Sequence, residues 1–193
     1  MIRNPFLLHR EGVRRSLGEE VRISNILIAK ILSESLKPTL GPRGMSKLLV
    51  DKFGESAVTS DGATILDKMD VYHPTAKVFK EVAKTVEKTV GDGTKTVVIL
   101  VGELLKRAED LIRHKLHVNT IIHGYRMAYE IALRNLRRIS RPVKFEDKEL
   151  LKKIAVTMLS TRNLGMATEH LANLVVEAVH AVAERRNGRV VID

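Results

Sequence analysis

Apolar residues recur every three to four positions through most of the chain, which is the spacing of one face of an α-helix. This pattern predicts helices over residues 19–36, 75–89, 96–112, 118–139, 149–159 and 168–184. A further short helix through Met69 should begin at Ser60 or Asp61, because either side chain can accept hydrogen bonds from the free N–H groups of a first turn. The sequence therefore predicts a mainly α fold.

Short strands are predicted at residues 47–50, 57–59 and 189–192, where apolar and β-branched residues cluster. The last of these lies at the end of the chain and needs a partner, so we expect it to belong to a larger fold. Pro142 follows the helix predicted at 118–139 and marks the one plausible linker. The linker divides the chain into a domain at residues 1–142 and the start of a second domain at residues 143–193.

Composition narrows the classes of function. The 193 residues include no cysteine, which excludes disulfides, thiolate nucleophiles and cysteine zinc sites. The longest apolar run, residues 97–101, is too short to span a membrane, and the N-terminus has no signal-peptide core, so we expect a cytoplasmic protein with no membrane partner. The net charge of +10 permits a nucleic acid or another anionic partner. However, four phenylalanines, three tyrosines and no tryptophan offer few platforms for base stacking.

Three glycine-rich turns concentrate the candidate chemistry. They are Thr39-Leu40-Gly41-Pro42-Arg43-Gly44, Ser60-Asp61-Gly62-Ala63-Thr64 and Gly91-Asp92-Gly93-Thr94-Lys95-Thr96. Glycine lets the backbone approach a ligand closely, and N–H groups at a helix start attract phosphate oxygens. An aspartate beside such groups can hold Mg²⁺ bridged to phosphates, and a second aspartate can orient an attacking water. The three turns together therefore predict a phosphate site.

A purely structural interpretation of these turns is also open. Asp-Gly and Gly-Pro are common turn formers, so each turn taken alone is readily explained by the path of the backbone. Neither the P-loop fingerprint nor the dinucleotide-binding fingerprint is present in the sequence. Spacing alone therefore leaves the phosphate site and the structural turns as alternatives.

The residue sequences of four segments, and their order along the chain, resemble those of group II chaperonins of the thermosome type. The segments are LKPTLGPRGMSKLLVD, SDGATILDKMDVYHPTAK, GDGTKTVVILVGELLKRAEDL and IIHGYRMAYEIAL, and the resemblance extends from about residue 11 to residue 193. It implies a helical bundle like the chaperonin equatorial domain, with a few short β-strands, followed by the start of an α/β intermediate domain.

The resemblance also implies a function and its partners. A chaperonin is an ATP-driven folding machine that binds Mg²⁺ with its nucleotide, assembles into a homo- or hetero-oligomeric double ring and acts on unfolded client proteins. Residues 1–142 would form the N-terminal half of the equatorial, ATP-binding domain. The apical domain and the C-terminal equatorial half, which supplies another catalytic aspartate and holds the adenine and ribose, would be absent. This chain alone is therefore expected to hydrolyse ATP weakly or not at all.

Carried over residue by residue, the resemblance implies a nucleotide site. Its nucleotide-binding positions are Thr39, Leu40, Gly41, Pro42, Gly62, Gly93, Thr94, Lys95 and Thr96. Asp92 matches the Mg²⁺-binding aspartate, and Asp61 matches the aspartate that helps to position water, so both are candidate catalytic residues. Arg162 replaces a lysine that usually senses the γ-phosphate, and its planar guanidinium changes the geometry. Lys95 departs from the usual threonine; it adds a cation near the phosphates or points to solvent, and we favour the former.

A second hypothesis comes from a different class of function. The chain could be a non-catalytic, chaperonin-derived interaction module that binds RNA or assembles with complete subunits. The basic pairs Arg14-Arg15, Arg137-Arg138 and Arg185-Arg186 are dispersed, which is more typical of solvated faces and ion pairs than of a nucleic-acid site. His114 and His117 lie three residues apart, but no carboxylate stands at a matching metal-ligand spacing, which favours structural or surface roles. Calorimetry with Mg·ATP distinguishes the two hypotheses.

Overall fold

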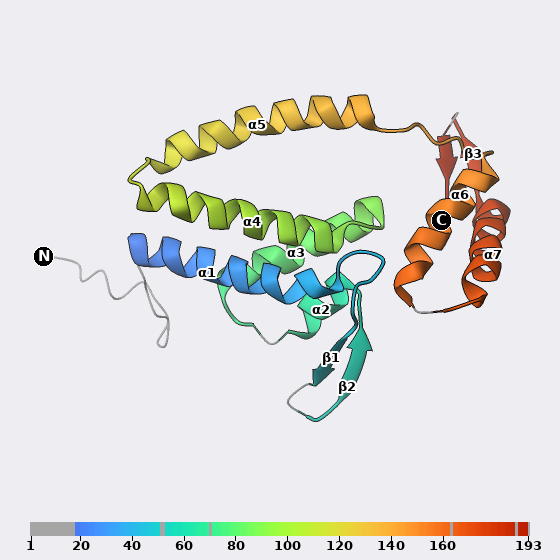
Figure 1. The fold of residues 1–193 in the computed structure, drawn as a ribbon, viewed down its shortest axis with the longest axis horizontal. Coiled ribbons are helices and arrows are strands. Elements are labelled where there is room, and N and C mark those ends of the chain that lie inside the picture. The colour runs from blue at the N-terminus through green and yellow to red at the C-terminus, as the bar shows by residue number, and fades with distance from the viewer. Residues whose placement is uncertain (1–17, 51–52, 70, 163, 188, 193) are drawn as a thin grey trace, which may run out of the picture.

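The computed structural model describes residues 18–50, 53–69, 71–162, 164–187 and 189–192 (Figure 1). It confirms a mainly α fold with two small antiparallel sheets. The helices are α1 (Glu19–Leu36), α2 (Gly62–Lys68), α3 (Pro74–Val90), α4 (Thr94–Arg113), α5 (Val118–Ile139), α6 (Lys148–Leu159) and α7 (Ala167–Val182), with 3₁₀ turns η2 (Lys37–Thr39) and η3 (Ser160–Arg162). The strands are β1 (Lys47–Val50), β2 (Ser56–Thr59), β3 (Glu184–Arg186) and β4 (Arg189–Val191). The basic pair Arg14-Arg15 lies outside the described residues.

Local chemistry explains where several helices begin. The Asp61 carboxylate accepts a hydrogen bond from the Thr64 N–H at 2.8 Å, so Asp61 rather than Ser60 caps α2. His73 caps α3 by accepting from the Thr75 N–H, and proline follows it at the first helical position. His117 caps α5 in the same way. A structural role for His117 is therefore observed directly.

Helices α1 to α4 share one hydrophobic core. The buried residues of this core are Ala29, Leu32, Leu36, Ile65, Leu66, Ala76, Phe79, Ala83 and Val98. Helices α1 and α4 pack closely at Gly102, where a Cβ atom would lie only 2.2 Å from the Cβ of Ser33. We call α1 to α4 the core unit. The first glycine-rich turn leads from η2 to β1, the second leads from β2 into α2, and the third joins α3 to α4. All three are attached to helices of the core unit, so its packing fixes their relative positions.

Helix α5 forms an outer layer on α4 (Figure 1). Ile121 is its buried residue, and the Tyr125 hydroxyl donates a hydrogen bond to the Leu104 carbonyl at 2.5 Å. Its large exposed apolar residues are Ile122, Met127, Tyr129, Ile131, Leu136 and Ile139. None of the helices in the described part of the chain is long and apolar enough to cross a membrane.

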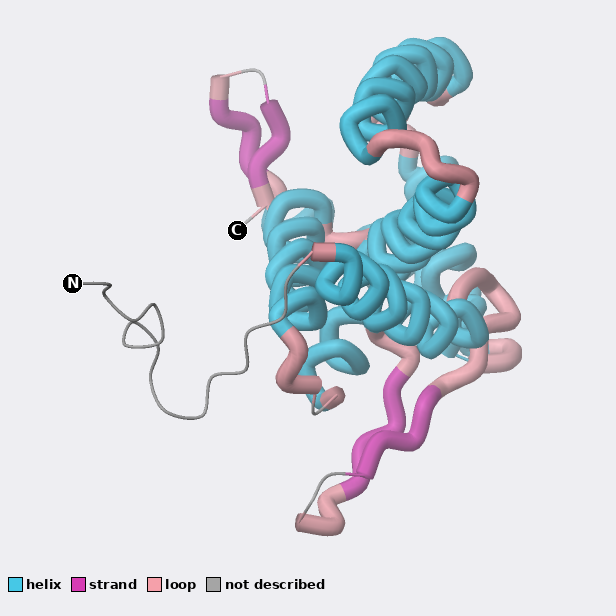
Figure 2. The backbone as a smooth tube through the Cα atoms, turned by 90° about the vertical axis from the view of Figure 1, so that its left-hand side faces the viewer, coloured by secondary structure: helices cyan, strands magenta, loops and turns pink. Residues whose placement is uncertain are grey.

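Helices α6 and α7 form a smaller packed unit through Ala155, Ala172 and Val176. The strands beyond α7 correct the sequence prediction. Helix α7 ends at Val182, two residues before the predicted end, and β3 pairs antiparallel with β4. The terminal strand therefore finds its partner within the chain, because Asn187 adopts a left-handed φ of 52° that reverses the backbone. Figure 2 shows both hairpins projecting from the helical body.

Ion pairs line the contact between α1 and α4. The Glu109 carboxylate accepts hydrogen bonds from Lys30 at 2.9 Å and from Arg113 at 2.6 Å, and its side chain is 14% exposed. The hydrogen bond from Lys30 lowers the pKa of Glu109 below its usual 4.5, and Arg113 acts in the same direction. This carboxylate therefore favours the folded state when it is ionised.

We expect Glu109→Gln to lower the thermal midpoint at pH 7 by about 2–4 °C, because the variant loses the charge that pairs with Lys30 and Arg113. The contribution of a carboxyl with a lowered pKa is complete above about pH 4.5 and is lost as the pH falls through the folded-state value. The difference from wild type should therefore shrink between pH 7 and pH 3 in circular dichroism melts. Glu130→Gln, on the exposed face of α5, is the control. A difference of constant size across this range would contradict the assignment.

Candidate functional site

The three glycine-rich turns meet at one end of the core unit, where the side chain of Lys95 in the third turn contacts the other two. Lys95 belongs to the third turn, and its Nζ donates a hydrogen bond of 2.7 Å to the carbonyl oxygen of Thr39 in the first. Its aliphatic chain covers Gly62 in the second, since a Cβ atom there would lie 2.5 Å from Lys95 Cγ. Segments far apart in the sequence therefore form one site, as a shared phosphate site requires.

The first turn presents its backbone rather than the Thr39 side chain. Thr39 is fully buried, and its hydroxyl donates to the Leu36 carbonyl at 2.8 Å. Leu40 is 44% exposed, and Gly41 has a φ of 84°, which favours glycine. The turn closes where the Gly44 N–H donates to the Gly41 carbonyl at 2.9 Å. Pro42 lies inside this closed turn, so the predicted residues 39–42 form one rigid corner.

The second turn holds Asp61 by two hydrogen bonds. Its N–H donates to the Thr59 hydroxyl at 3.1 Å, while Oδ2 accepts from the Thr64 N–H. The described residues show no hydrogen bond to Oδ1. Gly62 is buried, and a Cβ there would also lie 2.9 Å from the hydroxyl oxygen of Thr94. Because Gly62 has no side chain, the second and third turns come into direct contact.

The third turn leads into α4 through two glycines with positive φ, Gly91 at 79° and Gly93 at 91°. The Asp92 carboxylate is exposed and accepts from the Gly93 N–H through Oδ1 at 2.7 Å. Gly93 occupies the N-cap position and has no side chain to cap α4, in contrast to Asp61 at α2. Thr94 is buried against Gly62, whereas Thr96 is exposed. The first N–H groups of α4 therefore lack a side-chain cap and suit an anion.

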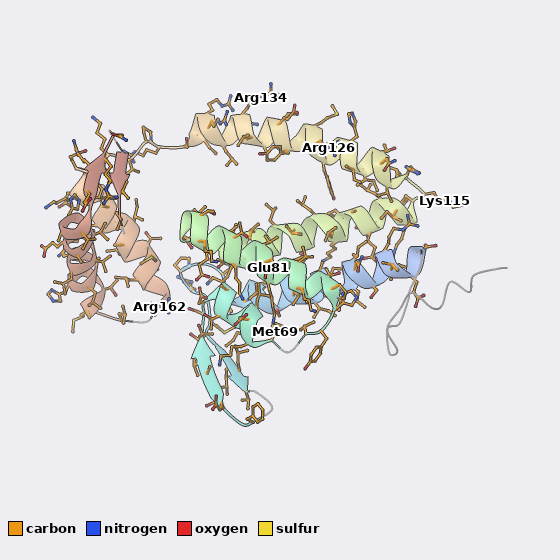
Figure 3. All side chains as sticks on the ribbon, turned by 180° about the vertical axis from the view of Figure 1, so that it is seen from behind. Met69, Glu81, Lys115, Arg126, Arg134 and Arg162 are labelled. Carbon is orange, nitrogen blue, oxygen red and sulfur yellow. The ribbon has the colours of Figure 1, made fainter. Side chains whose placement is uncertain are left out.

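The charges around the site act on the Lys95 ammonium. Burial lowers the pKa of Lys95 below its usual 10.5, and the nearby Asp61 carboxylate opposes this shift. Arg162 adds to the lowering and Asp92 opposes it. Figure 3 places Arg162 at the end of the smaller unit that faces the glycine turns. The structure thus brings both predicted aspartates and Arg162 within electrostatic reach of one lysine.

Two further residues hold the turns in position: Gly44, which the sequence places in the first turn without a binding role, and Thr59, which the sequence did not single out. Gly44 is required by packing, because a Cβ there would lie 2.3 Å from the Thr39 carbonyl oxygen. The only signal in the sequence was a second glycine in the Leu40–Gly44 segment. Thr59 orients the Asp61 backbone from the end of β2, and no local pattern indicated this. Both residues act by holding the turns in position.

The residues present fit a metal that arrives with its own phosphate ligands. Within the described part of the chain, no three histidine, aspartate or glutamate side chains gather to hold a metal. Mg²⁺ in nucleotide sites is held by one or two carboxylates together with phosphate oxygens and waters. Asp92 is exposed beside the uncapped start of α4 and supplies such a carboxylate. The site therefore suits Mg²⁺ bridged to a polyphosphate and does not suit a metal cage made by protein alone.

Comparison with known proteins gives the family. Residues 32–193 match the TCP-1/cpn60 chaperonin family, so the chain belongs to this family. It is 47% identical to thermosome subunit beta of Saccharolobus solfataricus and to thermosome subunit alpha of Archaeoglobus fulgidus, each over 98% of the chain. It is 48% identical to a thermosome subunit of Methanopyrus kandleri over 97% of the chain. The chain spans about a third of the length of these relatives, between 34% and 35%.

Proposed function

We propose that this chain is the ATP-binding portion of a chaperonin subunit. Residues 1–142 form the first half of the equatorial domain, and residues 143–193 begin the intermediate domain. The observation that carries the proposal is the meeting of three glycine-rich turns around Lys95, within reach of two aspartates and beside the uncapped start of α4. Membership of the chaperonin family supports the same conclusion.

Each predicted residue then has a distinct role. The first N–H groups of α4, from Thr94 to Thr96, bind phosphate oxygens, and the rigid turn at residues 39–42 lines the nucleotide. Asp92 holds Mg²⁺, which neutralises charge on the phosphates. Asp61 has one oxygen committed to the Thr64 N–H and uses the other to orient water. Arg162 lies near the terminal phosphate.

The proposal extends to assembly and location. We place the chain in a cytoplasmic double ring of chaperonin subunits that acts on unfolded proteins. Ile122, Tyr129, Leu136 and Ile139 are exposed on one side of α5, and apolar side chains that line up in this way favour burial against a partner, which supports assembly.

Mg·ATP binding by isothermal titration calorimetry tests the proposal. We expect the wild-type chain to bind, and Asp92→Ala to bind at least about 10-fold more weakly, because the variant removes a carboxylate from the metal. Asp110→Ala is the matched control: it makes the same change at the far end of α4, where the carboxylate is 55% exposed and pairs loosely with Arg107. Its affinity should equal that of wild type.

Two outcomes would overturn the proposal. One is the absence of binding by a folded wild-type chain; the other is an unchanged affinity in Asp92→Ala. If such a chain instead bound RNA with an affinity that fell steeply with salt and did not depend on sequence, the interaction-module hypothesis would replace the ATP site.

A further inference from the structure

Lys95 occupies the centre of the candidate site in a way that the turn sequences do not specify. Its Nζ reaches the Thr39 carbonyl across a separation of 56 residues. That carbonyl belongs to a fully buried residue whose own hydroxyl is already bonded to Leu36. The contact therefore ties the ammonium to a fixed point of the backbone rather than leaving it free in solvent.

The ammonium keeps donors for another partner. A lysine carries three N–H donors, and the described residues show one hydrogen bond from Lys95, to Thr39. The aliphatic chain lies against Gly62, so packing as well as the hydrogen bond fixes the position of the charge. A positive charge with two remaining donors is thus held where the first turn meets the side chain of the third.

The Lys95 ammonium can offset negative charge that gathers at the site. Asp61 and Asp92 lie near the site and repel an incoming polyphosphate unless a cation intervenes. A divalent metal is one such cation, and Lys95 is another that is part of the chain. Both aspartates act electrostatically on Lys95, which places the ammonium among the groups whose charge has to be offset.

We propose that Lys95 is a resident cation of the phosphate site, which lets the site hold a polyphosphate with less dependence on a divalent metal than its carboxylates alone would allow. This inference rests on the proposed function, since it concerns the same site. It assigns Lys95 a direct contact with a phosphate oxygen through the donors that Thr39 does not use.

The test compares binding of ATP and of inorganic tripolyphosphate to the full chain, each in excess Mg²⁺ and in excess EDTA. We expect Lys95→Met to lose about 10-fold more affinity than wild type when Mg²⁺ is removed, because it lacks a charged hydrogen bond to the anion. Methionine keeps the apolar chain that covers Gly62. Lys95→Arg keeps the charge and should remain within about 3-fold of wild type in EDTA.

Lys80→Met is the matched control. Lys80 also donates to backbone carbonyls, those of Asp67 and Met69, but at the far end of α2. It should show the same Mg²⁺ dependence as wild type. Circular dichroism melts of all variants establish that each is folded at the temperature of the titration.

The outcomes separate this inference from the proposed function. If wild type binds Mg·ATP and Lys95→Met loses no more affinity in EDTA than wild type, the role of Lys95 is wrong while the nucleotide site stands. If wild type fails to bind Mg·ATP but binds tripolyphosphate in a manner that depends on Lys95, the proposed function is wrong and the resident cation stands. Binding of neither ligand by the folded chain overturns both.

Discussion

Gly102→Ala should lower the free energy of unfolding by about 3 kcal/mol or more, although alanine is the better helix former by about 1 kcal/mol. The added Cβ would lie 2.2 Å from the Cβ of Ser33, 2.7 Å from its hydroxyl oxygen and 3.0 Å from the Ala29 carbonyl oxygen. Ser33 is only 1% exposed and donates a hydrogen bond to the Ile99 carbonyl. Because the obstacles are buried and partly backbone, α1 and α4 have to move apart.

Urea denaturation of Gly102→Ala and Gly124→Ala measures this effect against a matched control. Gly124 lies inside α5, and a Cβ atom added there would have no neighbouring atom within 4 Å, so alanine should stabilise the protein by up to about 1 kcal/mol. A double variant, Ser33→Gly with Gly102→Ala, removes the side chain that the new Cβ atom would meet. It should recover part of the lost free energy of unfolding. Equal stability of Gly102→Ala and wild type would show that this contact does not hold α1 against α4.

The helices follow from local pattern because each has one face that must be buried. Periodicity predicted α1 and α5 with the bounds that the structure shows, and it placed β1 at Lys47–Val50. Strand β3 could not be predicted in this way. Its residues are all charged and exposed, so no alternation indicates a strand. Pairing with β4 and the ion pair between Arg185 and Glu146 supply what local propensity lacks.

In the candidate site too, local sequence pattern predicts some features and contacts between distant segments determine the others. Glycines and aspartates in short turns are local signals, so Asp61, Gly62 and Asp92 could be predicted from the sequence alone. The contact between Lys95 and Thr39 joins residues 56 positions apart and leaves no trace in either turn. The sequence therefore predicted which turns take part, whereas packing decides how they meet. The roles of these residues in binding nucleotide stay predictions until the titrations are made.

Gly62→Ala should separate the stability of the chain from the integrity of its site. The new Cβ would lie 2.5 Å from Lys95 Cγ, 2.9 Å from the Thr94 hydroxyl oxygen and 3.1 Å from the Lys95 backbone nitrogen. The two side chains can rotate, but the backbone nitrogen belongs to the first turn of α4 and can retreat only with the helix. We therefore expect an overpacking cost of about 1–3 kcal/mol and a folded protein.

In Gly62→Ala, the affinity for Mg·ATP should fall by a larger factor than the stability of the fold. The displacement moves the start of α4 away from Asp61, and a shift of about 1 Å between groups that act together can cost about 100-fold. We expect the Mg·ATP affinity to fall by about that factor in calorimetry, while Gly124→Ala binds like wild type. A folded Gly62→Ala protein with wild-type affinity would show that the second and third turns need no direct contact to act on one ligand. A loss of binding with a preserved melt would mean that glycine at this position serves the site rather than the fold.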